Sequence, residues 1–333
     1  MNKSGASTGL KHNLLILGSQ NHNPKDQKLT RDEIRPVQIL YKDGRCEPVG
    51  FFNRWGKAGV SSMAWPDQEF RYLIVSVNDE LRKLYPGTGE WKTLDIPRIN
   101  DIHDIHFIDG HLWISNTEYD EIIEFETDDE KIIRRISLDK FRKADETGNT
   151  EAEKVKDRFH CNQAFRDYNG NLCVLIHHIS GWQYYRILFE MLVKSQGDGG
   201  VINLDTEDII PLKLQSPHTV RKIAGCYWIQ DSGDFTTKIY DKNWQLVDTI
   251  QNGGFGRGLD YDEKQGIAYI GLSATRKRYM KVIATGGYHL NRVLMVDLST
   301  HKKIGEIPVM NIEQLDNVYI LDDHAVEVFR KLD

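Results

Sequence analysis

Two stretches of the sequence follow one pattern, His103-Asp-Ile-His-Phe-Ile-Asp-Gly-His-Leu-Trp-Ile-Ser-Asn116 and His218-Thr-Val-Arg-Lys-Ile-Ala-Gly-Cys-Tyr-Trp-Ile-Gln-Asp231. In each, a polar residue opens an apolar run, a turn with glycine follows, and a second apolar run ends in small polar residues. Weaker copies occupy residues 61–78, 159–178 and 256–273. A strand-rich unit that recurs about every 40 to 60 residues is typical of a β-propeller. The sequence therefore predicts an all-β fold of this kind.

The spacing of the copies predicts the number of blades. Six inner strands are expected to begin near Ser62, His103, His160, His218, Arg257 and Asp316. Two of these spacings, of 41 and 39 residues, fit a bare four-stranded blade of about 40–45 residues. The longer spacings predict insertions, at residues 142–157, 181–200 and 274–290. We expect a single six-bladed domain over residues 1–333.

Both chain ends contain strands that lack partners nearby in the sequence. Residues 317–321 resemble an inner strand, and residues 13–52 hold three further strand-like runs. Combining the two ends would complete the sixth blade and close the ring without a long exposed edge. Residues 324–329 fit either a competing strand or a short helical tail.

Charge and hydropathy narrow the range of partners. The 333 residues include 43 basic and 49 acidic ones, a net charge of −6, which argues against binding nucleic acid or a membrane surface through bulk charge. No apolar run approaches the roughly 18 residues that span a bilayer. Residues 14–17 form too short an apolar core for a secretory signal. We expect a cytoplasmic protein with no nucleic-acid or membrane partner, whose four cysteines are reduced.

The propeller predicts where a ligand would bind. Inner strands begin, and second strands end, on the same face, together with two sets of loops. The polar residues at these positions are Asp104, Asn162 and Arg257 at strand starts, and Asn116, His178 and Asp231 at strand ends, besides the histidines discussed next. Loops gathered at one end of a scaffold often carry function. We therefore expect a central site on this face.

Three histidines, His103, His160 and His218, open three successive blades. If their rings meet at the axis with Asp104, they could bind a divalent metal such as Zn, Mn or Fe, or transfer protons. Alternatively they hydrogen-bond neighbouring loops or line a wet channel. A shift of one residue in the register of the third blade would turn His160 away. His177 and His178 are adjacent, so at most one of them should face the site.

Arg257 lies in a glycine-rich run, residues 253–258. No helix follows this run, so it is not a dinucleotide fingerprint, and its glycines instead favour a close approach of the backbone to the axis. Arg257 could clamp a carboxylate or phosphate, or it could pair with Asp260 or Asp316. Arg276 adds positive charge in a loop on the same face. Together these residues favour a small anionic or sugar-derived ligand.

Several short pieces resemble a bacterial family of six-bladed propellers described as conserved hypothetical proteins. They are Asp157-Arg-Phe-His-Cys-Asn162, Ser216-Pro-His218, Gly254-Phe-Gly-Arg-Gly-Leu259 and Gly271-Leu-Ser-Ala-Thr-Arg-Lys277. This resemblance implies the fold and no activity. More loosely, the architecture is similar to gluconolactonase-like and strictosidine-synthase-like propellers, some of which hold an axial metal through Glu, Asn and Asp. Here Ser61 and Ser62 stand where a carboxylate ligand would be expected, so those ligands are not carried over.

Two functional hypotheses follow. In the first, the protein is an enzyme that acts on a small anionic or sugar-derived substrate, by metal-assisted lyase, hydrolase or isomerase chemistry. In the second, the same face is a non-catalytic module that binds a protein or a glycan.

Overall fold

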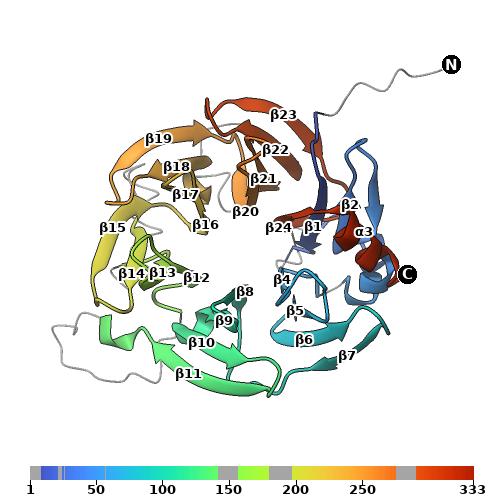
Figure 1. Ribbon diagram of the computed structural model, residues 1–333, viewed down its shortest axis with the longest axis horizontal. Coiled ribbons are helices and arrows are strands. Elements are labelled where there is room, and N and C mark those ends of the chain that lie inside the picture. Colours follow the sequence, from blue (N-terminus) through green and yellow to red (C-terminus); the bar gives the residue numbers. More distant parts are fainter. Residues whose placement is uncertain are drawn as a thin grey trace.

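The strands form six four-stranded antiparallel sheets arranged as a ring, as the computed structural model shows (Figure 1). The structure describes residues 9–21, 25, 27–56, 58–141, 157–179, 197–274 and 290–333. The six-bladed β-propeller predicted from the sequence is therefore confirmed. Most of each predicted insertion, and with it Arg276, lies outside the described residues.

The first three blades are built from consecutive strands. Blade one comprises β4 (Ser62–Ala64), β5 (Leu73–Val77), β6 (Glu80–Tyr85) and β7 (Glu90–Thr93). Blade two comprises β8 (Ile102–Ile108), β9 (His111–Asn116), β10 (Glu121–Glu126) and β11 (Lys131–Ser137). Blade three comprises β12 (Cys161–Arg166), β13 (Leu172–Ile176), β14 (Gly199–Asn203) and β15 (Ile209–Leu214).

Blades four and five repeat this plan, and blade six differs. Blade four comprises β16 (Pro217–Ile223), β17 (Cys226–Asp231), β18 (Thr236–Tyr240) and β19 (Leu246–Gln251). Blade five comprises β20 (Phe255–Asp262), β21 (Ile267–Ser273), β22 (Arg292–Asp297) and β23 (Lys303–Pro308). Blade six takes its inner strand β24 (Gln314–Leu321) from the C-terminal region and β1 (Asn13–Ser19), β2 (Val37–Leu40) and β3 (Cys46–Pro48) from the N-terminal region. The predicted closure by both ends is confirmed.

Short helices complete the described structure. The C-terminal α3 (Asp323–Arg330) resolves the ambiguity of that segment in favour of a helical tail, capped by Asp322, whose side chain accepts from the Ala325 N–H. Its apolar residues, including Phe329, pack into the core between blades one and six. The described residues also include the 3₁₀ turns η2 (Arg31–Glu33), η3 (Gly50–Trp55), η4 (Thr117–Tyr119), η5 (Asp139–Phe141) and η6 (Ser232–Asp234). Among the residues that the structure describes, no helix is both long and apolar enough to cross a membrane.

The hydrophobic core lies between neighbouring blades. Trp113 of blade two packs with Phe159 and Val174 of blade three, and Trp228 of blade four packs with Leu259 and Ile270 of blade five. These contacts bury the two faces of each sheet, which is what holds separate blades together. All four cysteines are free thiols.

Polar side chains of the inner strands join each blade to the next. Ser62 donates to Asp104, whose carboxylate also accepts from Gln163 in blade three. The remaining junctions are made by Gln163 accepting from the Val220 N–H, Thr219 donating to the Arg257 carbonyl, Arg257 donating to Asp316, and the Met63 N–H donating to Tyr319. A belt of hydrogen bonds therefore closes around the axis and fixes the inner strands relative to one another.

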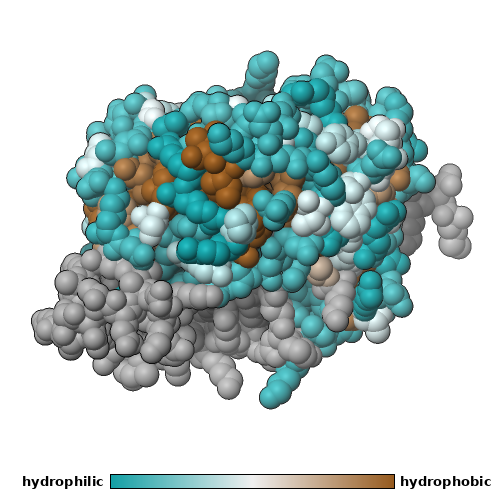
Figure 2. Space-filling model, turned by 90° about the horizontal axis from the view of Figure 1, so that it is seen from below, coloured by the Kyte–Doolittle hydropathy of each residue, from teal (hydrophilic) through white to brown (hydrophobic). Residues whose placement is uncertain are grey.

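Exposed apolar side chains lie mainly on the outer strands. Those on outer strands are Trp91 in β7, Ile133 in β11, Ile209 in β15, Leu246 and Val247 in β19, and Ile304 in β23. On the side seen in Figure 2, hydrophobic residues show through a mostly hydrophilic surface. Because these exposed residues are spread over five blades, they do not by themselves define one docking surface.

Candidate functional site

A register irregularity recurs near the start of the inner strand in five blades. It leaves His103 and Asp104 unpaired in β8, Asn162 in β12, Thr219 in β16, Arg257 and Gly258 in β20, and Asp316 in β24. A β-bulge of this kind redirects a side chain and is common beside functional sites. The bulges explain why so many polar residues of the repeat lie at one end of the inner strands.

Glycine is needed at one of these bulges. A Cβ atom on Gly258 would lie 2.5 Å from the Val318 nitrogen and 2.8 Å from the backbone of Asn317 in the next inner strand. No real Cβ atom tolerates such distances, so only glycine lets β20 and β24 approach this closely. The expectation that this glycine-rich run serves close backbone approach agrees with the structure.

Four imidazole rings form a cluster around the starts of blades two, three and four. The ring of His103 lies 4.5 Å from that of His160 and 6.2 Å from that of His218, between centroids. His177 lies 4.3 Å from His160 and 5.3 Å from His218. The structure thus brings together all three histidines selected from the sequence and adds a fourth.

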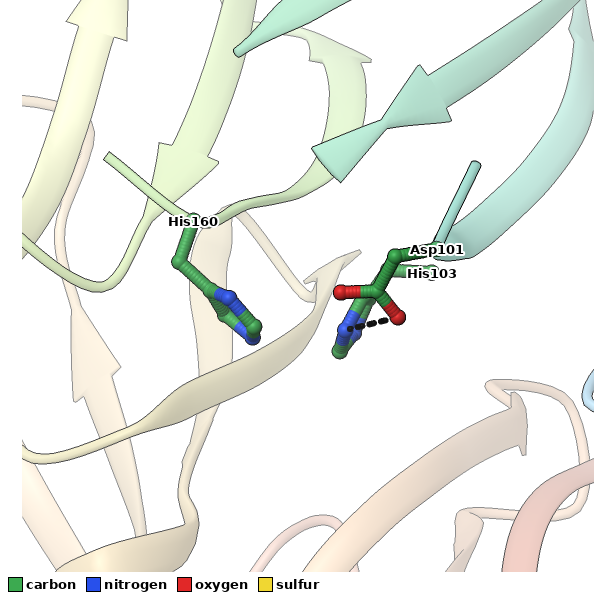
Figure 3. Close-up of side chains that lie close together, drawn as sticks. All are labelled: Asp101, His103 and His160. Atoms are coloured by element: carbon green, nitrogen blue, oxygen red, sulfur yellow. Dashed lines mark ion pairs between the residues drawn. The ribbon is translucent and has the colours of Figure 1, made fainter. Parts of the chain in front are cut away.

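Asp101 completes a group that could hold a metal ion (Figure 3). One donor atom each from Asp101, His103 and His160 lie within 4.8 Å of one another. Asp101 lies immediately before β8, and its Oδ1 atom is 3.5 Å from Nε2 of His103. His160 reaches toward them from the residue before β12. His218 is outside this group of three, although its ring is close to two of the imidazoles.

Carboxylates hold the loop that carries His160. Asp157 binds Nδ1 of His160 at 2.7 Å, which leaves Nε2 as the atom for a metal. The buried Asp120 accepts from the backbone N–H groups of Arg158, Phe159 and His160, at 2.7, 2.9 and 3.2 Å. A histidine ligand oriented through its other nitrogen by a carboxylate is the usual outer-shell arrangement of metal sites.

The backbone is left-handed at several of these residues. φ is +51° at both Asp101 and His160, and +58° at Asp157. This conformation costs an L-residue with a side chain roughly 1–2 kcal/mol. Such outliers cluster at functional sites, where the surrounding contacts impose them. At His160 the left-handed turn has a visible consequence. The residue precedes the strand by one position, the shift that would have turned it away, yet its ring faces His103.

Burial lowers the pKa of His103, and the nearby charges act on it in both directions. Asp101 opposes the lowering, whereas His160 and Arg257 add to it. The lowered pKa of His103 favours the neutral imidazole, which is the form that can ligate a metal.

Asp104 is part of the belt of hydrogen bonds that joins the inner strands. Its Oδ1 accepts from Ser62 at 3.1 Å, and its Oδ2 lies 3.0 Å from Nδ1 of His106 and 2.8 Å from Nε2 of Gln163. Burial acts to raise the pKa of Asp104, but the bond from His106 and the positive charges of His106 and Arg221 outweigh it and lower the pKa. The ionised carboxylate thus joins three blades beside the imidazole cluster.

Arg257 makes the ion pair that was one of its two predicted fates. Its Nη1 lies 2.6 Å from Oδ1 of Asp316, and both side chains are largely buried. The pair leaves further guanidinium donors for an anion. Asn162, also buried, donates to the Pro217 carbonyl, and within the described part of the chain no donor reaches its Oδ1.

The residues selected at strand ends are held by the protein itself. Asn116 is fully buried, accepts from the Asn100 N–H and donates to Glu121. Asp231 is equally buried, accepts from the Gln215 N–H and pairs with Lys238 at 2.6 Å. Burial raises the pKa of Asp231 to about 6, although Lys238 opposes this. These contacts favour a role in holding the loops before β8 and β16.

His178, which was selected from the sequence, lies next to the imidazole cluster. The ring in contact with His160 and His218 is that of His177, and the ring of the buried His178 lies 5.7 Å from that of His177, between centroids. Sequence reasoning also missed Asp101. Its position two residues before His103 was a usable signal, because a bulge or a tight turn can bring i and i+2 side chains together at the start of a strand.

Comparisons with known proteins agree with the fold. A family model described as "Domain of unknown function (DUF4915)" matches residues 80–328. No curated protein matches the chain in sequence. A structure of a protein of unknown function from Bacteroides caccae is similar, with a TM-score of 0.58 and 11% identity, over 92% of this chain and 97% of that one.

Two further solved structures match this chain at similarly low identity. A luciferin-regenerating enzyme gives a TM-score of 0.50 at 12% identity, over 80% of this chain and 86% of that one. The dihydro-heme d1 dehydrogenase NirN gives 0.42 at 12% identity, over 89% of this chain and 56% of that one. At 12% identity the likeness to the luciferin-regenerating enzyme shows the fold alone.

Proposed function

This chain belongs to the DUF4915 family, whose function is unknown, and we propose that it is an enzyme with a divalent metal held by Asp101, His103 and His160. The observation that carries this proposal is the convergence of three donor atoms within 4.8 Å. Two of the three residues have left-handed backbones. Strain of that kind is retained when a site needs it.

The residues present fit a transition metal. Two imidazoles and one carboxylate are ligands that Zn, Mn and Fe accept. Ligands of tetrahedral zinc lie about 3.3 Å apart, so the side chains would need to close by at most about 1.5 Å. Three protein ligands leave room for a water or substrate, and a metal there would polarise a substrate oxygen.

Arg257 supports a small anionic or sugar-derived substrate. Its positive charge is close enough to His103 to lower that residue's pKa, so an anionic group bound to Arg257 would lie near the proposed metal. Asp316 fixes the guanidinium at 2.6 Å, which would hold the substrate in one orientation. The reaction classes that suit this arrangement are hydrolysis, elimination and isomerisation.

The test is the metal content of the purified protein and of three variants. We expect about one equivalent of Zn, Mn or Fe in the wild type and its loss in His103→Ala and His160→Ala. The matched control is His301→Ala, because His301 also pairs with a carboxylate, Asp248 at 2.5 Å, and does so on blades four and five away from the cluster. Circular dichroism would verify that each variant folds.

A negative result would favour the other hypothesis. The proposed metal-dependent enzyme would be contradicted if all four proteins lacked metal and neither added metals nor sugar acids stabilised them against heat. That result would favour a module that binds a protein or glycan. Metal retained in both histidine variants would place the ion elsewhere.

A further inference from the structure

The ion pair of Arg257 and Asp316 leaves hydrogen-bonding groups of both side chains unused. Nη1 of Arg257 donates to Oδ1 of Asp316 at 2.6 Å, and no other described residue accepts a hydrogen bond from this guanidinium. Oδ2 of Asp316 is buried, and no donor within the described ranges reaches it. The two side chains are 14% and 5% exposed. The pair therefore presents spare donors beside a spare acceptor.

The backbone holds this pair in one geometry. Arg257 and Asp316 each lie at a register irregularity of an inner strand, in β20 and β24. Directly after Arg257, a Cβ atom on Gly258 would lie 2.5 Å from the Val318 nitrogen, so the two strands are in backbone contact beside the pair. Because both side chains start from strands in contact, the spare donors and the spare acceptor keep a fixed spacing, as recognition of a small ligand requires.

A second spare acceptor lies at the same end of the inner strands. Asn162 is at the irregularity of β12 and is 3% exposed. Its amide nitrogen donates to the Pro217 carbonyl, which can only accept, so the amide orientation is fixed and Oδ1 is the atom that no described donor reaches. From Pro217 the contacts continue to Thr219, which donates to the Arg257 carbonyl. The guanidinium therefore has an unused acceptor on either side of it along the ring.

The missing partners define the chemistry of a ligand. A buried acceptor without a donor costs free energy, which a ligand that supplies the donor recovers. Sulfate and simple carboxylates supply acceptors only, so they would satisfy Arg257 but place an oxygen against Oδ2 of Asp316. A hydroxyl on the carbon next to a carboxylate supplies the missing donor at the adjacent atom.

We propose that the substrate of this site is a 2-hydroxy carboxylate, with its carboxylate on the spare donors of Arg257 and its 2-hydroxyl donating to Oδ2 of Asp316. A further hydroxyl along the ligand would donate to Oδ1 of Asn162. This inference rests on the proposed function and narrows its anionic or sugar-derived substrate to one class. It also gives Asp316 a direct contact with the substrate, besides its ion pair.

The first experiment compares ligands that differ in the 2-hydroxyl, on metal-free wild-type protein. The probes are D-glycerate and L-glycerate, with 3-hydroxypropionate, which lacks only that hydroxyl, and sulfate. Binding is followed by NMR at the Nε–H signal of Arg257, identified by its absence in Arg257→Lys. One enantiomer of glycerate should bind at least about tenfold more tightly than 3-hydroxypropionate or sulfate, because a hydrogen bond to a charged acceptor is lost without the hydroxyl. Glycerate that does not bind, or binds within about twofold of either comparison ligand, would overturn the inference.

The second experiment removes the acceptor. Asp316→Asn keeps the size of the side chain but loses the charge, so the preference for glycerate over 3-hydroxypropionate should fall to about threefold or less. The matched control is Asp109→Asn, since Asp109 also pairs with an arginine, Arg166 at 2.9 Å, and does so on the exposed surface of blades two and three. It should keep the wild-type preference. An unchanged preference in folded Asp316→Asn would overturn the inference, and the wild-type comparison decides it if that variant does not fold.

The metal measurement separates this inference from the proposed function. A wild type that holds none of the three metals but prefers glycerate would contradict the proposed enzyme and support the hydroxyl contact. A wild type that holds the metal but shows no preference would overturn the hydroxyl contact alone.

Discussion

Blades two and four contain the two clearest copies of the sequence repeat, and the backbone at the end of the second strand is nearly the same in both. His103 and His218 stand thirteen residues before Asn116 and Asp231, which end β9 and β17 with nearly the same backbone, φ −92° and ψ 81° against φ −88° and ψ 79°. Each is followed by a one-turn 3₁₀ helix that ends in a left-handed residue. We call the strand end and the 3₁₀ turn after it the corner of the blade, residues 116–120 in blade two and 231–235 in blade four. The repeat therefore specifies the same backbone at both corners.

The two corners differ in what they hold. At the left-handed end of η4, the carboxylate of Asp120 binds three backbone N–H groups of the loop that carries His160. The corresponding residue after η6 is Phe235, which packs as a buried apolar side chain. One polar side chain at an otherwise equivalent corner thus positions a candidate ligand of the next blade. Equivalence of backbone does not imply equivalence of function.

The largest effect should be the same in both blades. Trp113→Ala and Trp228→Ala each remove a nearly fully buried side chain from an interblade core, and we expect each to lower the free energy of unfolding by about 3–5 kcal/mol. Urea unfolding would measure both, with Val247→Ala, an exposed position on β19, as a control expected within about 0.5 kcal/mol. A difference of more than about 2 kcal/mol between the two tryptophan variants would show that the blades are not equivalent in packing.

The next effect is a pH dependence of the free energy of unfolding that arises in blade four, at Asp231. The pKa of Asp231 is about 6 in the folded protein against an ordinary value of 3.8, so between these pH values the folded state binds more protons than the unfolded state. Stability should therefore fall as pH rises from about 4 to about 6, by roughly 2–3 kcal/mol from this group.

Asp231→Asn, which copies the amide of blade two, should remove this component of the pH dependence. Urea unfolding of both proteins at several pH values would measure it. Parallel stability curves for the wild type and the variant would contradict the prediction.

A smaller effect concerns the hydroxyl groups that link each corner to the next blade. Thr117 donates to the Cys161 carbonyl at 2.6 Å, and Ser232 donates to the Gly256 carbonyl. Thr117→Val and Ser232→Ala each leave a buried carbonyl without that donor, so each should cost about 1–2 kcal/mol of unfolding free energy. Only Ser232→Ala should also change the imidazole signals of His218, whose Nδ1 lies 2.8 Å from Oγ of Ser232. The same change in Thr117→Val would argue against a specific contact.

The smallest effect concerns strain in the third blade. His160→Gly should be more stable than His160→Ala by about 1 kcal/mol, because glycine adopts a φ of +51° without cost. The comparison His106→Gly against His106→Ala, in the middle of β8, should have the opposite sign. Thermal unfolding of the four metal-free variants would test both signs, and equal stabilities at position 160 would exclude the strain.

The repeat in the sequence predicted the fold because each blade is specified by strand and turn patterns within its own 40 to 60 residues. Strand patterns, turn residues and the spacing of the copies indicated six blades and the closure by both ends. Arg257 had two expected roles, and its ion pair with Asp316 depends on the approach of β20 to β24, which the sequence alone does not give.

The sequence by itself determined which blades open with histidine and that polar residues gather at one end of the ring, since both follow from repeat position. Only the tertiary structure decided which rings meet. A bulge or a left-handed residue changes the direction of a side chain by more than the alternation of a strand predicts, as His160 and Asp101 show. The selection of His177 over His178 likewise depends on how β13 ends against the loop before β12. These outcomes depend on contacts between blades, which no single repeat encodes.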